Sequence, residues 1–184
     1  MDLFLIKHKL QHDFPLVREV TPAHPMRAAV MVMLYPRHNK TYVLMTKRAM
    51  HLKYHAGEVG FPGGVFEEDE DDDLLATALR ETEEEVAIEI EPEDVLGRLP
   101  LVSTRLGFEI TPFVSVLSSA PEYELAEDEV DEVLEIPFTS LLAMQQRDVG
   151  SKPDEQGVMY WFQHHRIWGA SAKILNQIGH LAMY

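Results

Sequence analysis

Residues 57–88 read GEVGFPGGVFEEDEDDDLLATALRETEEEVAI, and the strongest structural and chemical signals of the chain lie in this stretch. It contains a Phe-Pro-Gly-Gly turn followed by a segment with the apolar spacing of a helix. Glu81, Glu84 and Glu85 are spaced i, i+3, i+4, so on a helix they project from one side. Three like charges repel one another in that arrangement, and a cation among them would relieve the repulsion.

A glutamate-rich run is usually a solvated helix face. This helix, however, also has an apolar side that predicts packing against the rest of the protein, so its acids are held on a fixed element. The apolar positions are Leu74, Leu75, Ala78, Leu79, Val86 and Ile88. Arg80 supplies only one local counter-charge, and carboxylate oxygens at this density suit Mg²⁺ or Mn²⁺. The sequence therefore predicts a divalent metal site.

The composition places this site in a single globular unit. The chain has 184 residues, 46% of them hydrophobic, which suits one domain (1–184) with a lead-in segment at 1–26. Residues 65–94 hold 15 acids and one arginine, so nearly all of the net charge of −15 lies in this span. The acidity argues against nucleic-acid binding, which needs a basic face. Cysteine is absent, which excludes disulfides and thiolate chemistry.

The remaining segments predict strands and helices in alternation. Apolar or alternating runs indicate strands at residues 28–35, 41–47, 95–103, 110–117 and 158–163. Helical spacing is expected from about 136 to 146 and over 167–183, whereas the acidic span 121–135 and the span 147–157 are expected to be loops. The apolar run at 1–7 is too short for a signal peptide or a membrane span. We expect a cytoplasmic protein that does not bind membranes.

The central stretch resembles the Nudix box, G-x5-E-x7-R-E-U-x-E-E-x-G-U, where U is a bulky aliphatic residue. The matching positions are Arg80, Glu81, Glu84, Glu85 and Ile88. Thr82 stands where an aliphatic residue is expected, and Ala87 replaces the final glycine. The span from Gly64 to Arg80 is two residues longer than the pattern, so Glu70 fits when counted from the glycine and Asp72 when counted from the arginine.

A second motif lies just before the box. Leu44-Met45-Thr46-Lys47-Arg48-Ala49, followed by Lys53, Gly57 and residues 61–64, resembles LLTxR[SA]x3Rx3Gx3FPGG. That signature marks the coenzyme A pyrophosphatase branch of the Nudix hydrolases. Lys53 replaces the second arginine, which keeps the charge and loses the bidentate fork. A basic loop facing an acidic metal site is also what a phosphoanhydride requires.

The resemblance implies an α/β fold, a Nudix-like α/β/α sandwich with a mixed sheet, and metal-dependent hydrolysis of coenzyme A or its derivatives into 3′,5′-ADP and 4′-phosphopantetheine or its acyl form. It implies metal ligation by Glu81, Glu84, Glu85 and the Gly63 carbonyl. Glu84 is the expected base, with Glu81 and Arg80 beside it, and Arg80 is expected to pin the loop through an acid such as Asp72. Substrate contacts are expected from Arg48, Lys53, His55 and Gly64, and one further acid from Glu127 or Glu129.

Three alternatives stay open. The same chemistry could act on another nucleoside diphosphate derivative, such as ADP-ribose, a dinucleotide or an oxidised nucleotide. A Nudix-shaped module could bind a ligand without catalysis, although such modules usually lose the metal acids that are present here. A simple ion-binding acidic protein would have no use for the Phe61–Gly64 turn. The expected partner is a small molecule, and a homodimer is compatible with the sequence.

Overall fold

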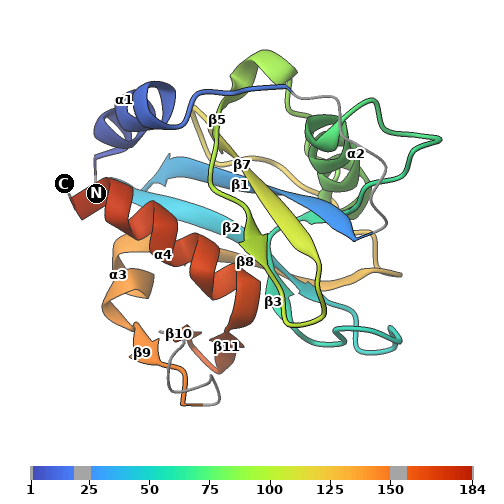
Figure 1. Ribbon diagram of the computed structural model, residues 1–184. Coiled ribbons are helices and arrows are strands. Elements are labelled where there is room, and N and C mark those ends of the chain that lie inside the picture. Colours follow the sequence, from blue (N-terminus) through green and yellow to red (C-terminus); the bar gives the residue numbers. More distant parts are fainter. Residues whose placement is uncertain (1, 19–25, 150–156, 184) are drawn as a thin grey trace.

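A mixed sheet lies between two helical layers in the computed structural model, which describes residues 2–18, 26–149 and 157–183 (Figure 1). The helices are α1 (Leu3–Asp13), α2 (Leu74–Val86), α3 (Phe138–Ala143) and α4 (Gly169–Met183), with a 3-10 turn, η1, at Pro92–Asp94. The main sheet contains β1 (Arg27–Arg37), β2 (Lys40–Arg48), β3 (Val59–Gly60), β4 (Gly63–Val65), β5 (Val95–Arg98), β6 (Val102–Ser103), β7 (Glu109–Val116) and β8 (Val130–Pro137). A smaller sheet contains β9 (Gln146–Arg147), β10 (Val158–Phe162) and β11 (His165–Ile167).

Strand β1 occupies the centre of the main sheet, in the order β3-β2-β1-β7-β5. It pairs antiparallel with β2 and β4 and parallel with β7, which makes the sheet mixed. In the register of β1 with β4, Ala29 lies opposite Gly64 and Val30 opposite Gly63. The Gly-Gly turn is therefore fixed to the central strand.

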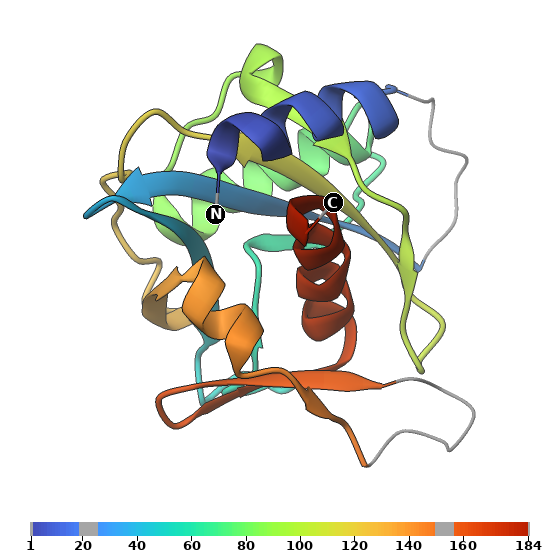
Figure 2. The ribbon, with the colours of Figure 1, turned by 90° about the vertical axis from the view of Figure 1, so that its left-hand side faces the viewer.

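Two apolar clusters form on opposite faces of the sheet, because successive side chains of a strand point to opposite sides. Val32 and Leu34 of β1 face the layer of α1, α3 and α4, whereas Met31 and Met33 face α2. Figure 2 views the first layer, with α1, α3 and α4 in front of the sheet and the smaller sheet below them. Helices on both faces confirm the predicted α/β/α sandwich.

The turn between β1 and β2 and the two ends of α2 have clear local causes. The turn between β1 and β2 places His38 and Asn39 at φ +47° and +57°, as a two-residue hairpin with a primed turn requires. Helix α2 begins after Asp73, whose side chain accepts a hydrogen bond from the Ala76 N–H. It ends at Ala87, which adopts the left-handed φ of +53° that glycine favours.

Several predicted boundaries were wrong. The segment 95–103 is not one strand, because Pro100 cannot donate to the ladder and separates β5 from β6. Residues 130–135, expected in a loop, belong to β8, where Val130, Leu134 and Ile136 are buried and acids stand between them. The final helix begins at Gly169, since the preceding residues form β11.

The predicted lead-in contains α1, and part of the predicted 147–157 loop, residues 150–156, lies outside the described residues. No helix within the described residues combines the length and the apolar character needed to cross a bilayer.

Candidate active site

The acidic side of α2 lies against the Gly-Gly turn. Gly64 approaches the Glu81 carboxylate so closely that a Cβ atom on Gly64 would lie 2.2 Å from a carboxylate oxygen. The Gly63 N–H donates a hydrogen bond to the Glu85 carboxylate. Because β4 is paired to the central strand, the turn holds both carboxylates at one place, which we call the acidic centre: Glu81, Glu85, Gly63 and Gly64.

Glu85 is a buried acid with few hydrogen bonds or opposite charges to stabilise its ionised form. Its side chain is 3% exposed, and its Oε2 atom has no hydrogen-bond partner among the described residues. Burial raises the pKa of Glu85 to about 8, with the charges of Glu81 and Glu129 acting in the same direction. Burial likewise raises the pKa of Glu81. A buried carboxylate with an unpaired oxygen is expensive unless a cation or donor reaches it.

Glu84 occupies the solvent side of the same cluster. Arg80 Nη1 donates to Glu84 Oε2 at 3.0 Å and to Glu81 Oε1 at 3.1 Å. The side chain of Glu84 is half exposed, so it can reach solvent water more easily than the other two acids. The predicted triad thus divides into the buried Glu85, the partly buried Glu81 and the exposed Glu84.

Arg80 is fixed by Asp71, which corrects the expectation of Asp72. Arg80 Nε and Nη2 donate to the two carboxylate oxygens of Asp71 at 2.9 and 3.1 Å, a bidentate contact. Asp71 is buried and also accepts from the Thr77 hydroxyl and the Glu67 N–H, whereas Asp72 is exposed. Burial alone would raise the pKa of Asp71, but these hydrogen bonds outweigh it, and the pKa lies below its ordinary value.

Replacing Asp71 by asparagine should destabilise the protein and weaken catalysis. The amide keeps the volume of the side chain and loses the charge that holds Arg80, so we expect about 2 kcal/mol less unfolding free energy at pH 7. Urea unfolding at pH 7 measures this difference. Asp69→Asn, at an exposed position of the same loop, is the matched control and should change little.

The stability difference between wild type and Asp71→Asn should depend on pH. A carboxylate whose pKa is depressed on folding stabilises the protein above its unfolded pKa of about 3.9, and this contribution disappears as the pH falls through the folded pKa. The stability difference between wild type and Asp71→Asn should therefore shrink below about pH 4. A difference that stayed constant on acidification would show that the charge of Asp71 is not what stabilises the loop.

The basic loop between β2 and β3 meets the acidic centre only at its base. Arg48 Nη1 lies 3.6 Å from Glu85 Oε1, and the Arg48 and Gly57 backbones are joined by a 3.0 Å hydrogen bond. The ammonium of Lys53 lies 5.0 Å from the ring centroid of Tyr54, and His55 Nδ1 contacts Glu58 Oε2 at 3.0 Å. Arg48 thus contacts the acidic centre, whereas Lys53 and His55 contact residues of their own loop.

Of the two further acids, Glu129 lies near the acidic centre, since its charge raises the pKa of both Glu81 and Glu85. Glu127 is not among the groups that act most strongly on them. The Glu129 carbonyl accepts from the Ala49 N–H at 2.8 Å, which joins the segment before β8 to the base of the basic loop.

A divalent cation fits this donor set. Within residues 2–18, 26–149 and 157–183, no three acids or histidines are already drawn together as a cation requires, and Arg80 and Arg48 lie among the carboxylates. The unpaired buried oxygen of Glu85 is nevertheless the kind of hard donor that a divalent ion would satisfy. Glu81 and Glu85 would hold such an ion, with Glu84 and Glu129 close by.

Sequence reasoning missed the role of Asp71. It lies nine residues before Arg80, in a run of seven consecutive acids, and the run itself contains no signal that selects one of them. The signal that points to Asp71 is Thr77 on the inner face of the predicted helix, because a buried hydroxyl needs a hydrogen-bond partner.

Comparison with known proteins gives a consistent result. The family model described as "NUDIX domain" matches residues 25–171. A Cronobacter sakazakii protein named "Uncharacterized Nudix hydrolase NudL" is 40% identical over 83% of this chain and 80% of its own. An Escherichia fergusonii protein of the same name is 35% identical over 97% of this chain and 92% of its own.

Solved structures agree with the fold. The NUDIX domain of Shewanella oneidensis NrtR, in complex with ADP ribose, aligns with a TM-score of 0.53 at 21% identity, over 66% of this chain and 79% of that one. A MutT/nudix family protein from Enterococcus faecalis aligns with a TM-score of 0.59 at 17% identity, over 93% of this chain and 66% of that one.

Proposed function

Since this chain belongs to the Nudix family and is a pyrophosphohydrolase, we propose that its substrate is coenzyme A or an acyl derivative. The cut would fall at the diphosphate and give 3′,5′-ADP and 4′-phosphopantetheine or its acyl form. The observation that carries the proposal is the contact of Arg48, from the LMTKRA motif, with Glu85 of the Nudix box. Two motifs that are separate in sequence thus meet at one centre.

The loop geometry adds support. Gly57, the glycine of the coenzyme A signature, has φ +71° and closes the loop by its backbone bond to Arg48. The next residues form β3, which leads directly into the Phe-Pro-Gly-Gly turn. The loop that carries Lys53 is therefore anchored beside the acidic centre, where a cation can reach one end of a diphosphate ligand.

The reaction needs water to attack a negatively charged diphosphate that repels nucleophiles. When bound, a divalent ion, Mg²⁺ or Mn²⁺, would supply positive charge to the diphosphate and would make the attacking water more acidic. Glu81 and Glu85 hold the required negative charge in place, and the Gly63 carbonyl is the further proposed ligand. Glu84, on the solvent side, orients the attacking water or accepts its proton. Arg80 positions Glu81 and Glu84 through its anchor on Asp71.

A panel of diphosphates tests the substrate. Coenzyme A, ADP-ribose, a dinucleoside polyphosphate and an oxidised nucleotide are each incubated with the protein and Mg²⁺, and kcat/KM is measured by product release. Coenzyme A should have the highest value. Equal or faster hydrolysis of ADP-ribose would contradict the proposal, and hydrolysis of none of them would contradict catalysis itself.

The rate should be highest under alkaline conditions. Burial holds the pKa of Glu85 near 8, so the ionised form that a cation requires becomes more populated as the pH rises toward that value. The profile of kcat/KM for coenzyme A between pH 5 and 10 measures this. A maximum near pH 5 would instead indicate a histidine of the basic loop, His51 or His55, as the base.

A further inference from the structure

Arg48 and Glu85 face each other at the acidic centre without a hydrogen bond between them. Arg48 Nη1 lies 3.6 Å from Glu85 Oε1, beyond hydrogen-bond range. Among the described residues, neither the buried Nε atom of Arg48 nor the buried Oε2 atom of Glu85 has a hydrogen-bond partner. A buried donor and a buried acceptor are each costly to leave unpaired, so this contact is an arrangement that a further group can improve.

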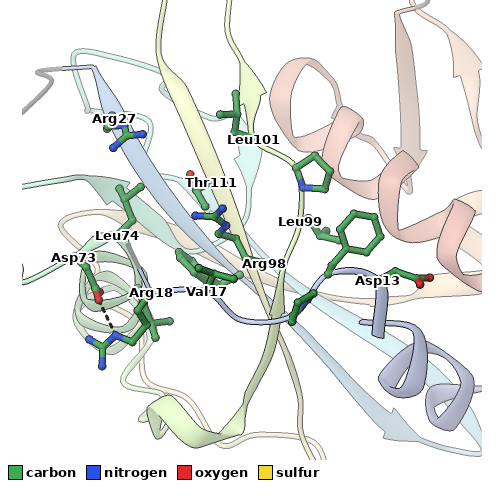
Figure 3. Close-up of a pocket in the computed structure, with 15 residues that line it drawn as sticks. Asp13, Val17, Arg18, Arg27, Asp73, Leu74, Arg98, Leu99, Leu101 and Thr111 are labelled. Atoms are coloured by element: carbon green, nitrogen blue, oxygen red, sulfur yellow. Dashed lines mark hydrogen bonds and ion pairs between the residues drawn. The ribbon is translucent and has the colours of Figure 1, made fainter. Parts of the chain in front are cut away.

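Two other arginines near α2 are bound more completely. At the N-terminal end of the helix, Arg18 Nε donates to Asp73 Oδ2 at 2.7 Å (Figure 3). At the acidic centre, Arg80 Nε and Nη2 donate to both carboxylate oxygens of Asp71. Arg80 is therefore fixed by an acid outside the cluster that it touches, whereas the Nε atom of Arg48 has no such partner in the part of the chain that the structure describes. Of the two arginines among the carboxylates, Arg48 is the one held less firmly.

The backbone of Arg48 is fixed although its side chain is not. The Arg48 N–H donates to the Glu58 carbonyl, and the Arg48 carbonyl accepts from the Gly57 N–H, both at 3.0 Å. The next residue, Ala49, donates to the Glu129 carbonyl at 2.8 Å. The Arg48 side chain is 35% exposed, so it already reaches solvent in part. A change of side-chain rotamer can therefore move the guanidinium without disturbing the strand or the loop.

A divalent ion and the Arg48 guanidinium would compete for the same carboxylate. Such ions lie about 2.0–2.6 Å from their oxygen ligands, so an ion on Glu85 would come closer than the guanidinium does and could bind the unpaired Oε2 atom. Glu85 is buried, and positive charges a few ångströms apart in such a space repel strongly because little water screens them. The ion carries twice the charge of the guanidinium and also has Glu81 as a ligand, so it should win the competition.

We propose that Arg48 is an exchangeable counter-ion of the acidic centre. Its guanidinium stands beside Glu85 in the metal-free protein and moves away from Glu85 when a divalent ion binds. After release, the guanidinium stays next to the centre on its fixed backbone and can donate hydrogen bonds to an anionic ligand. Metal binding thus prepares the base of the basic loop for an anion. The inference rests on the proposed metal site at Glu81 and Glu85 and is the same for any diphosphate substrate.

Chemical modification of arginines tests the exchange without measuring turnover. Phenylglyoxal reacts with accessible guanidinium groups, and peptide mass spectrometry gives the rate at each arginine, here at pH 8.5, above the pKa of Glu85. Addition of Mg²⁺ should make Arg48 react about fivefold faster, the factor expected when a weak ion pair no longer holds a guanidinium. Arg18 is the internal control: its partner Asp73 precedes Glu85 by twelve positions, about 18 Å along the helix axis, so its rate should not respond to Mg²⁺.

Two variants of α2 separate release from other effects of the ion. In Glu85→Gln the charge beside Arg48 is gone, so Arg48 should react fast without Mg²⁺, and Mg²⁺ should add little. Glu83→Gln makes the same chemical change at an exposed position of the same helix and should behave as wild type. Arg80 reports folding in each variant, because loss of its bidentate contact with Asp71 on unfolding would make it react faster. The comparison of wild type with and without Mg²⁺ needs no variant.

Amide NMR of the same samples shows separately whether Mg²⁺ occupies the acidic centre. Shifts at Gly63, Gly64 and Glu85 together with an unchanged or slower reaction of Arg48 would overturn the exchange and leave the metal site in place. The absence of shifts at these amides would overturn the metal site and the exchange with it. A metal-free wild type in which Arg48 reacts as fast as in Glu85→Gln would show that Glu85 does not hold the guanidinium, which would also overturn the proposal.

Discussion

Glu85→Gln and Glu84→Gln should each lower kcat on coenzyme A by about a hundredfold or more. Each change removes one carboxylate charge and keeps the length of the side chain, so the helix remains intact. Cation-assisted charge stabilisation is worth several kcal/mol in such reactions, and about 3 kcal/mol corresponds to two orders of magnitude in rate. Steady-state kinetics at saturating Mg²⁺ measures the loss, and wild-type turnover in both variants would remove the assignment of the acidic centre.

The same helix provides the matched control. Glu83 is exposed and directly precedes Glu84 in sequence, so Glu83→Gln makes the same chemical change outside the acidic centre and should leave kcat within about twofold. Folding is checked by urea unfolding without metal. The raised pKa of Glu85 means that ionising it costs stability as the pH rises toward 8, so metal-free Glu85→Gln should be at least as stable as wild type at pH 8.

The acidic centre was readable from the sequence because its parts are local. The spacing of Glu81 and Glu85 places both on one side of a helix, and the Gly-Gly turn lies one loop upstream. The central strand was equally clear, since residues 28–35 form a continuous apolar run bounded by a turn. Patterns that repeat within one helical turn or one strand need no knowledge of distant contacts.

The partner that fixes Arg80 could not be predicted from such local patterns. Counting from the box selects Glu70 or Asp72 as its first acid, yet the buried partner of Arg80 is Asp71, in a loop two residues longer than the pattern. The choice depends on Thr77 and on the Glu67 N–H, which meet only in the folded loop. Counting positions against a pattern fails where an insertion alters backbone geometry.

The residues on the α2 side of β1, β5 and β7 show the same limit on a larger scale. Arg27, Arg98 and Thr111 are separated by up to 84 positions, and no local pattern relates them. The parallel pairing of β1 with β7 and the antiparallel pairing of β5 with β7 bring them onto one face. Sequence reasoning predicted these strands in part, but not their order or register.

Coenzyme A should be hydrolysed about ten- to a hundredfold faster than dephospho-coenzyme A, as judged by kcat/KM. The two ligands differ only in the 3′-phosphate, and one charge-assisted hydrogen bond to it contributes roughly 1.5–3 kcal/mol. Lys53 is the better candidate for that contact. Arg48 lies 3.6 Å from Glu85, so Arg48→Ala should also disturb the acidic centre and slow both ligands.

Lys53→Ala should therefore erase most of the preference and leave the hydrolysis of dephospho-coenzyme A little changed. Its ammonium lies over the ring of the exposed Tyr54, a residue of the same loop. Lys40→Ala, at the exposed first residue of β2, removes an equal charge and should keep the preference. Equal rates on both ligands in the wild type would remove the reason to prefer coenzyme A over ADP-ribose and the dinucleotides as the substrate. A preference that survives in Lys53→Ala would keep coenzyme A as the substrate and place the 3′-phosphate contact on another element.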